Sequence, residues 1–322
     1  MKKSPIEKKT RDVYHDIHIK QGENKGIFNR LTQLLSPNYL KEEDNFFKGK
    51  ICLDAGCGSN ASSTYSMLKY GAEKVYAFDV DETIFEKAPE LLKEFEGKYE
   101  LKVDNVLNMQ YDDNFFDFVH CGGVLHHTTD LPGGIKELGR VTKNGGILEI
   151  MTYGKGGLVR ELTSYFREKY KRDEEFKALI DKIDAQYFEK FFQEIFSIMK
   201  DNDDRFINLP TKDVMRSLFD EDLALTIKDR IKSPVYLEHS EEEIIAFLKE
   251  AGFPLTHRLT RYPVYTNIRK FLSPLYYQYN SEFSKLLYGS GAIQIKANPV
   301  SLKPYATPVP VIKRLASYVA SP

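Results

Sequence analysis

The sequence predicts an α/β fold in which helices cover both faces of a mostly parallel sheet. From Lys50 to about residue 153, short apolar runs alternate with helical patterns. The apolar runs lack polar alternation, as expected for strands that are buried on both faces. A glycine-rich turn, Gly56-Cys57-Gly58, directly follows the first of these runs. Strand–helix alternation over about a hundred residues is typical of right-handed βαβ units, which build a doubly wound sheet.

The expected elements follow one another along the chain. Residues 27–35 predict a short amphipathic helix after a polar and charged start. Core strands are expected in ICLD (51–54), KVYAFD (74–79), YELKVD (99–104), FFDFVHCG (115–122) and GGILEIMT (145–152). The helices between them are expected in SSTYSMLKYG, ETIFEKAPELLKEF and LPGGIKELGRVT.

The second half of the chain has a different pattern. Residues 155–235 read as a helical insertion of roughly 80 residues, far longer than an ordinary loop. Its aromatic stretch, DAQYFEKFFQEIFSIM, places its rings on one helical face, which we interpret as core packing within an insertion that closes over the site. Ser240 and Glu243 form a predicted capping box, and Gly252 ends that helix.

Two late strands complete the expected sheet. They are THRLTRY (256–262) and AIQIKA (292–297), separated by a Pro- and Tyr-rich helical stretch over 263–290. The proline-rich tail is expected to be irregular. The predicted organisation is an N-terminal helical arm (1–45), a core (46–154), the insertion (155–235), the last helix with the late strands (236–298) and the tail (299–322).

Composition narrows the class of partner and compartment. The formal net charge of −1, with basic and acidic residues intermixed, disfavours nucleic acid and an anionic membrane as partners. The odd count of three cysteines without a CxxC pair argues against a disulfide framework. No run approaches the roughly 20 apolar residues of a membrane span, and no apolar stretch follows the first lysines.

These features predict a cytoplasmic protein. Because no His, Cys and Asp cluster has ligand spacing, we expect no metal site. Nothing in the sequence specifies an oligomeric state.

The glycine turn points to a ligand. In an open parallel sheet, ligands bind beyond the carboxyl ends of the strands. Gly56 and Gly58 lack a Cβ, so backbone N–H groups can touch a ligand there, and the helix expected to start near Ala61 attracts a negative group. Asp79 ends the second expected strand and can accept hydrogen bonds from ribose hydroxyls. A nucleoside-containing ligand is therefore predicted.

Two alternatives to that reading stay open at this point. The spacing also satisfies the G-x-G-x-x-A pattern of NAD sites, which by itself is a weak signal. A tight turn without any ligand is the second alternative.

A larger pattern identifies a family resemblance. LDAGCGSN, FDVDE, VDNVLNMQYDDNFFDFV, VLHHTTD and ELGRVTKNGGILEI occur in that order. In this combination the chain resembles the class I S-adenosylmethionine (SAM)-dependent methyltransferases of the small-molecule branch. The resemblance covers roughly residues 50–153, with a looser likeness over 229–262. It implies a Rossmann-like, seven-stranded, mostly parallel sheet in which AIQIKA is the one reversed strand, beside THRLTRY.

The resemblance also implies how the chain would hold SAM. Asp54 and the two turn glycines would line the methionine part, and the carboxylate of SAM would lie near the helix start beyond Asn60. Asp79 would bind both ribose hydroxyls, and Val80 would contact the adenine.

Further positions complete the implied cofactor site. An acid or amide after the third strand would meet the adenine amino group, and the two directions of counting select either Asp104 or Asn105. Cys121 and Gly122 would pass beneath the sulfonium, and Tyr14 would belong to an arm folded over SAM. The full implied set is Tyr14, Asp54, Ala55, Gly56, Cys57, Gly58, Asn60, Asp79, Val80, Asp104, Asn105, Val106, Cys121 and Gly122.

Four residues are candidates for catalysis. His126 and His127 follow the fourth expected strand, where imidazole could take a proton from the acceptor. Alternatively they anchor the turn before the helix that Asp130 caps. Asp229 and His239 precede the last helix, in a segment that borders the acceptor pocket in the resembled family; their alternatives are a surface group and a neighbour of the helix cap.

We therefore predict a methyltransferase that uses SAM to methylate an O or N atom of a small-molecule acceptor. The alternatives are an NAD(P)-dependent oxidoreductase on a Rossmann fold and a non-catalytic SAM-binding module. His120, inside the fourth expected strand, is interpreted as a satisfied core residue.

Overall fold

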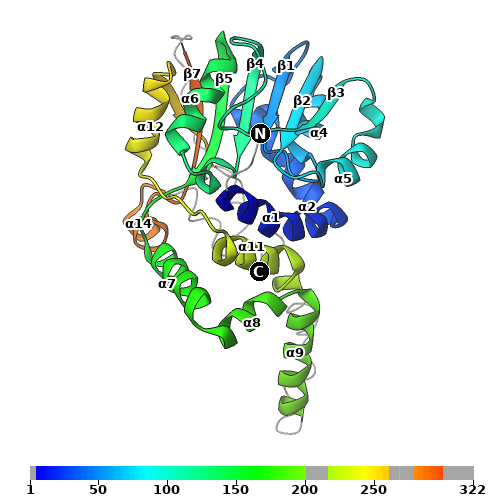
Figure 1. Ribbon diagram of the computed structural model, residues 1–322, viewed down its shortest axis with the longest axis vertical. Helices are drawn as coiled ribbons and strands as arrows, with labels where there is room; N and C mark the ends of the chain where they lie inside the picture. Colours follow the sequence, from blue (N-terminus) through cyan, green and yellow to red (C-terminus); the bar gives the residue numbers. More distant parts are fainter. Residues whose placement is uncertain (1–4, 201–216, 261–267, 269–278, 300–322) are drawn as a thin grey trace, which may run out of the picture.

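A seven-stranded sheet forms the centre of the protein. The computed structural model describes residues 5–200, 217–260, 268 and 279–299. Within them the strand order is β3-β2-β1-β4-β5-β7-β6 (Figure 1). The strands are β1 Ile51–Ala55, β2 Lys74–Asp79, β3 Tyr99–Val103, β4 Phe116–Gly122, β5 Thr142–Tyr153, β6 Leu255–Arg258 and β7 Ala292–Asn298. β7 pairs antiparallel with β5 and β6, and the other pairs are parallel. The predicted fold class and its reversed strand are confirmed.

Helices surround this sheet and extend beyond its carboxyl edge. They are α1 Pro5–Glu23, α2 Lys25–Leu31, η1 Thr32–Leu35, α3 Pro37–Leu40, α4 Ser62–Lys69, α5 Ile84–Leu91, η2 Lys93–Phe95, η3 Leu125–His127, α6 Leu131–Val141, α7 Leu158–Arg172, α8 Glu174–Lys182, α9 Ala185–Lys200, α11 Glu221–Lys232, α12 Glu241–Glu250 and α14 Glu282–Tyr288. The predicted tail and most of the 263–290 stretch lie outside the described residues.

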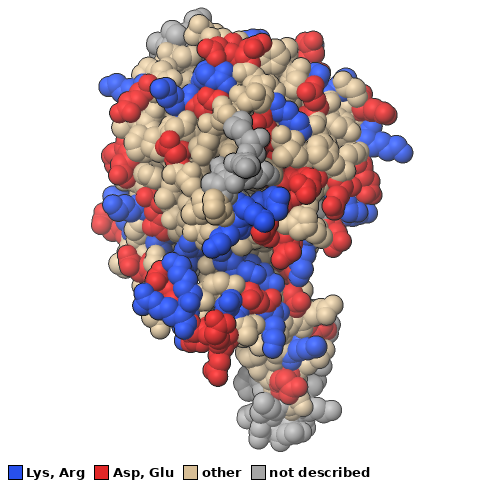
Figure 2. All heavy atoms as spheres, viewed as in Figure 1, with Lys and Arg blue, Asp and Glu red and all other residues tan. Residues whose placement is uncertain are grey.

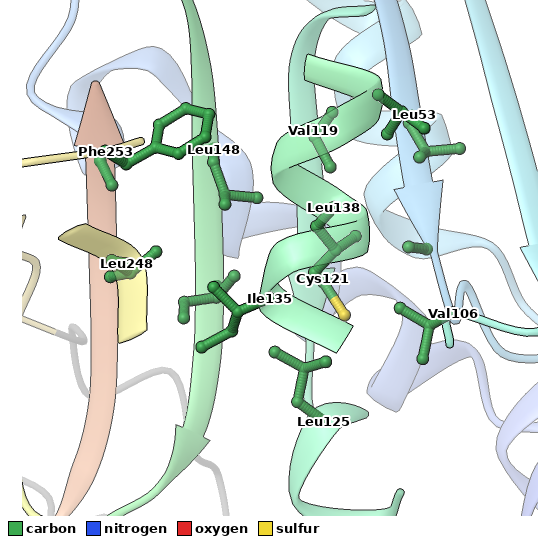
Figure 3. Close-up of a cluster of buried hydrophobic side chains, with 14 of the residues drawn as sticks. Leu53, Val106, Val119, Cys121, Leu125, Ile135, Leu138, Leu148, Leu248 and Phe253 are labelled. Carbon is green, nitrogen blue, oxygen red and sulfur yellow. The ribbon is translucent and has the colours of Figure 1, made fainter. Parts of the chain in front are cut away.

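Each face of the sheet has its own apolar core. On one face, Ile135 and Leu138 of α6 and Leu248 of α12 pack against Val119 and Leu148 of the central strands (Figure 3). The opposite face is covered by α4, α5 and the segment around α3. Burial on both sides explains why the core strands are apolar without alternation.

Local chemistry sets several helix boundaries. The Asp130 carboxylate accepts a hydrogen bond from Gly133 N (2.9 Å) and caps α6 as predicted. Ser240 and Glu243 form the predicted capping box of α12. The helix expected over 82–95 is divided in two. The α-helix α5 contains Pro89 and ends at Leu91, and a separate 3₁₀ turn, η2, follows it.

The N-terminal arm and the insertion meet below the carboxyl edge of the sheet. α1 lies between that edge and α11, and α9 extends away from the body of the protein (Figure 1). Two ion pairs join the arm to α11: Lys20 with Glu221 (3.1 Å) and Arg30 with Asp222 (2.8 Å). The insertion predicted over 155–235 thus contributes α11 to the region where the strands end.

The aromatic stripe of α9 is only partly packed. Phe188 and Phe192 contact Phe219, with ring centroids 5.7 and 5.0 Å apart. Phe191, by contrast, is 54% exposed, so the prediction of a core role is wrong for this residue. The helical period placed the rings on one side, but the neighbouring helices cover only part of that side.

Candidate functional site

The turn after β1 requires glycine at its first position. Gly56 has φ +80°, and a Cβ there would lie 2.2 Å from Cγ2 of Val124. Gly58 has φ +63°, but a Cβ there would meet nothing closer than the His18 ring, 3.8 Å away. Gly56 N and Cys57 N both donate to the Phe78 carbonyl, at 2.8 and 2.9 Å. These bonds tie the turn to β2, and the His18 ring lies at ordinary contact distance from the Cβ position of Gly58.

Asp79 at the end of β2 is held by the same turn. Its Oδ2 accepts a hydrogen bond from Gly58 N (3.1 Å), and its Oδ1 accepts one from Asp81 N (3.2 Å). The side chain is 6% exposed. Because each carboxylate oxygen has two lone pairs, one acceptor position on each oxygen is left for ribose hydroxyls.

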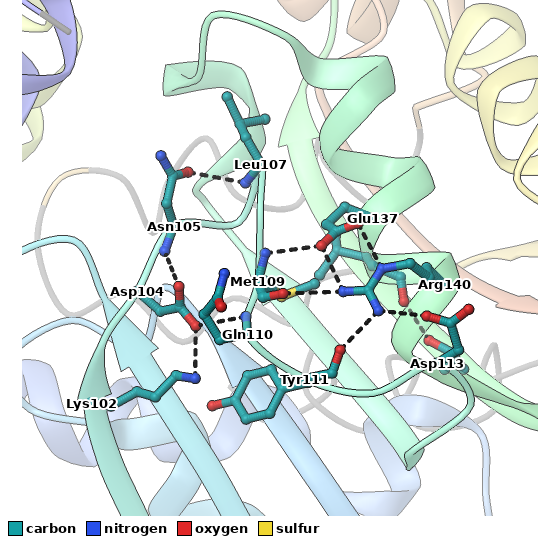
Figure 4. Close-up of polar contacts among 12 residues, drawn as sticks. Lys102, Asp104, Asn105, Leu107, Met109, Gln110, Tyr111, Asp113, Glu137 and Arg140 are labelled. Carbon is teal, nitrogen blue, oxygen red and sulfur yellow. Dashed lines mark hydrogen bonds and ion pairs between the residues drawn. The ribbon is translucent and has the colours of Figure 1, made fainter. Parts of the chain in front are cut away.

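The loop after β3 contains both residues predicted as partners of the adenine amino group, and only one of them lines the cavity. Asp104 forms an ion pair with Lys102 (2.8 Å) and accepts hydrogen bonds from the backbone N–H groups of Asn105 and Gln110 (Figure 4). Asn105 lines the central cavity, and its Oδ1 accepts from Leu107 N (3.0 Å). The geometry therefore presents Asn105, and not Asp104, to a ligand in that cavity.

A cavity of about 340 Å³ lies at the carboxyl edge of the sheet, between the glycine turn, α1 and α11. Most of the predicted site residues line it: Tyr14, Asp54, Gly56, Cys57, Gly58, Asn60, Asp79, Val80, Asn105, Val106, Gly122, His127 and Asp229. The remaining predicted residues do not line it: Ala55, Asp104, Cys121, His126 and His239. Ala55 and Cys121 instead belong to the buried apolar core, in which Figure 3 shows Cys121.

One end of this cavity brings together four residues from four segments. Asp229 of α11 accepts hydrogen bonds from the hydroxyls of Tyr14 in α1 (2.5 Å) and Tyr153 in β5 (2.7 Å). His127 Nε2 lies 3.5 Å from the same carboxylate. His127 Nδ1 is 2.9 Å from the carbonyl oxygen of Val235, to which it can donate. We call Tyr14, His127, Tyr153 and Asp229 the acceptor-end cluster.

Burial sets the protonation of this cluster. Burial, assisted by the Asp229 charge, raises the pKa of both Tyr14 and Tyr153 well above that of free tyrosine, so both hydroxyls keep their protons. Burial lowers the pKa of His127 below its ordinary value, while the Asp229 charge acts in the opposite direction. A neutral imidazole with Nδ1–H bound to a carbonyl has its lone pair on Nε2.

The other two predicted catalytic histidines do not line the cavity. His126 stacks on Tyr153 (3.7 Å between centroids), and burial lowers its pKa well below its ordinary value. His239 packs edge-on against Phe247, and its backbone N–H donates to the Tyr153 carbonyl (3.3 Å). Their place in the sequence was close to the site, but their side chains point into the surrounding packing.

Sequence reasoning missed several cavity residues. His120, expected in the core, lines the cavity and contacts Glu149 through its Nδ1. Gln294 and Tyr153 line it as well. The sequence did contain one signal: His120 and Glu149 are ionisable residues inside otherwise apolar strands. Such groups are costly to bury without a partner, so their presence there indicates a paired or functional role.

A topology of this kind, with a glycine turn after β1 and an acid after β2, defines a Rossmann-like nucleoside-binding protein. Residues 53–150 match the family described as Methyltransferase domain. This part of the chain therefore belongs to the class I SAM-dependent methyltransferases, whose cofactor is S-adenosylmethionine.

Three curated proteins illustrate the similarity. An uncharacterized protein of Methanocaldococcus jannaschii is 30% identical over 143 residues, covering 39% of this chain and 58% of that protein. A demethylmenaquinone methyltransferase of Geobacillus stearothermophilus is 36% identical, covering 32% and 45% respectively. The corresponding enzyme of Staphylococcus saprophyticus is 25% identical, covering 61% and 82%. The match thus spans about half the length of the first two relatives.

Among the described residues, no helix combines the length and the apolar content needed to cross a bilayer. Within the same residues, no three His, Cys, Asp or Glu side chains gather as a metal site would require.

Proposed function

We propose that this protein transfers a methyl group from SAM to an O or N atom of a small-molecule acceptor that lies against the acceptor-end cluster. The observation that carries the proposal is the continuity of the cavity. The glycine turn and Asp79 line it together with His127 and Asp229. A cofactor held at the first two would therefore face an acceptor held at the last two.

The residues present fit SAM. When bound, SAM supplies a methyl group that is already activated by a positively charged sulfur. Asp79 has acceptor positions left for the ribose, and Asn105 offers an amide to the adenine. At the amino-acid end, Asn60 is 4% exposed, and its Nδ2 has no hydrogen-bond partner among the described residues. A buried donor without a partner is costly unless a ligand completes it.

His127 is the group best placed to accept the proton of the acceptor. Its Nδ1 is turned to the Val235 carbonyl, so the lone pair of Nε2 is available. Asp229 lies 3.5 Å from Nε2 and would stabilise the imidazolium that forms. Tyr14 and Tyr153 hold the Asp229 carboxylate in place through their hydroxyls. General-base assistance of this kind is typically worth about 10²–10⁴-fold in rate.

The lining of the cavity favours a small acceptor without phosphate groups. No Lys or Arg side chain is found among the described lining residues, whereas Ile6, Leu31, Leu34 and Leu225 contribute apolar surface. On the face shown in Figure 2, basic residues lie among acidic ones, which gives a polyanion no single-sign surface there. Because two relatives are named demethylmenaquinone methyltransferases, quinones and their reduced forms, which are phenols, belong in the first substrate panel.

The test is a transfer assay with methyl-labelled SAM. Phenols, amines and carboxylic acids of small size, followed by metabolite extracts, are offered as acceptors, and the labelled product is identified by mass spectrometry and NMR. We expect label on oxygen or nitrogen. Label on carbon would contradict the proposed acceptor atom, and SAM binding without any labelled product would favour a non-catalytic module. Calorimetry that detects NAD but not SAM would overturn the proposal altogether.

A further inference from the structure

Three ionisable residues form a buried row across the central strands. Asp54 of β1 is in register with His120 of β4, which is in register with Glu149 of β5. Their exposed fractions are 1%, 8% and 0%. Charged groups this deep are found only where they are paired and hydrogen-bonded. The mechanism proposed above uses neither His120 nor Glu149.

A chain of hydrogen bonds fixes the orientation of His120. The Tyr39 hydroxyl donates to Gln294 Oε1, which turns Gln294 Nε2 toward Glu149 Oε1 (2.6 Å). The other carboxylate oxygen of Glu149 contacts His120 Nδ1. His120 Nε2 is therefore directed to the α4 side, 3.2 Å from Ser63 Oγ, and both residues line the cavity.

The charge of Glu149 favours the protonated form of His120. Lys296 is the register neighbour of Glu149 on β7, but its ammonium is bonded to Glu42 and to the Leu40 carbonyl (2.8 Å). The fully buried Glu149 carboxylate therefore pairs with the His120 imidazole and not with Lys296. The groups that face His120 are Glu149 from β5, Asp54 from β1 and Ser63 from α4. Burial raises the pKa of Asp54, so Glu149 is the carboxyl group that favours a positive imidazole here.

Among the described lining residues, histidine is the residue type that can carry a positive charge. The amino-acid end of SAM carries a carboxylate, yet the described lining residues include no Lys or Arg. The lining groups that can carry a positive charge are His18, His120 and His127, and His127 belongs to the acceptor-end cluster. Three residues before Ser63, the Asn60 Oδ1 accepts from Ser62 N (3.2 Å), and the buried Nδ2 of Asn60 has no hydrogen-bond partner among the described residues.

We infer that His120, held as an imidazolium by Glu149, binds the carboxylate of the cofactor, with Asn60 Nδ2 as a second donor. The inference rests on the proposed function, because it assigns a partner to the amino-acid end of SAM. Glu149 acts through His120 and is a positioning residue. A charge-assisted hydrogen bond from a buried imidazolium replaces the Lys or Arg that a carboxylate usually meets.

Two related nucleosides isolate this contact. S-adenosylhomocysteine carries the amino-acid end, whereas 5′-methylthioadenosine has the same adenine and ribose without it. Their affinities for wild type, His120→Gln, Glu149→Gln and Asn60→Ala are measured by calorimetry. The control is His257→Gln on β6, an exposed histidine in the register row next to Lys296 that does not line the cavity.

We expect His120→Gln to weaken S-adenosylhomocysteine binding about tenfold or more while 5′-methylthioadenosine binding stays unchanged, since charge-assisted hydrogen bonds are worth about 1.5–3 kcal/mol. Glu149→Gln should act in the same direction, and Asn60→Ala more weakly. The control should change neither affinity. Equal losses for both nucleosides, or an unchanged preference for S-adenosylhomocysteine, would overturn the inference.

Two outcomes keep this test separate from that of the proposed function. If wild type binds neither nucleoside, the proposed function fails, whereas a wild type that binds both leaves only the role of His120 in question. If thermal melting shows that His120→Gln does not fold, Asn60→Ala decides, because it leaves the buried row intact. A preference for S-adenosylhomocysteine that this variant does not reduce would then count against the inference.

Discussion

The two ends of the cavity are built in different ways. At the cofactor end, the chain from Asp54 to Asp79 supplies a strand, a glycine turn, a helix and the next strand, and a backbone N–H of the turn bonds directly to Asp79. At the acceptor end, Tyr14 and Asp229 meet across 215 residues of sequence. Local turn geometry on a rigid sheet determines the first end, while the packing of α1 and α11 determines the second. Substitutions should therefore separate binding of the cofactor from turnover.

The largest effect is expected at the acceptor end. His127→Gln removes the lone pair that accepts the proton, so kcat should fall by about 10²–10⁴-fold. The affinity for S-adenosylhomocysteine, measured by calorimetry, should stay within a small factor of wild type. His126→Gln is the matched control, because the neighbouring ring does not line the cavity. Equal losses of kcat in both variants would show that packing, and not proton transfer, limits the rate.

Asp79→Ala should weaken binding of the cofactor, whereas His127→Gln should mainly lower kcat. It removes charge-assisted hydrogen bonds to the ribose worth about 1.5–3 kcal/mol, which corresponds to roughly 10–150-fold in affinity. The turn also loses its bond from Gly58 N, so folding is checked by thermal melting. Asp79→Asn should be milder, because it keeps one acceptor oxygen. An unchanged affinity for SAM in Asp79→Ala would contradict the placement of the ribose.

Gly56→Ala separates close approach from backbone strain. At φ +80° a Cβ costs about 1–2 kcal/mol, and contact with Val124 at 2.2 Å adds to this. Gly97→Ala has nearly the same φ, +83°, with nothing within 4 Å of the new Cβ. The free energy of unfolding, from denaturant titration, should therefore fall more for Gly56→Ala. Equal losses would mean that the loop around Val124 moves aside without cost.

The smallest expected effect concerns pH. Because burial lowers the pKa of His127, the acid limb of wild-type kcat/KM should have its midpoint at a lower pH than a free histidine would give. The decline follows protonation of the base. Asp229→Asn removes the charge that raises this pKa, so the acid limb should move to still lower pH. A limb that moves to higher pH would identify another group as the base.

The sequence predicted the cofactor end of the cavity better than the acceptor end. Gly56, Gly58 and Asp79 were identifiable because strand ends, positive φ and the spacing of a βαβ unit are local properties. His126 and His239 were reasonable candidates by position, yet neither lines the cavity. Position along the chain indicates which loop is near a site, but it does not indicate which side chain of that loop turns inward.

The sequence alone predicted the succession of strands and helices, the glycine turn and the acid at the end of the second strand, since each depends on contacts within a few residues or one βαβ unit. The reversed late strand was expected from the family resemblance. Only the tertiary structure decided that Asn105 faces the cavity, that Tyr153 completes the acceptor-end cluster and that His120 is held by Glu149. These facts depend on strand register and on the packing of α1 and α11, which join segments that the sequence separates.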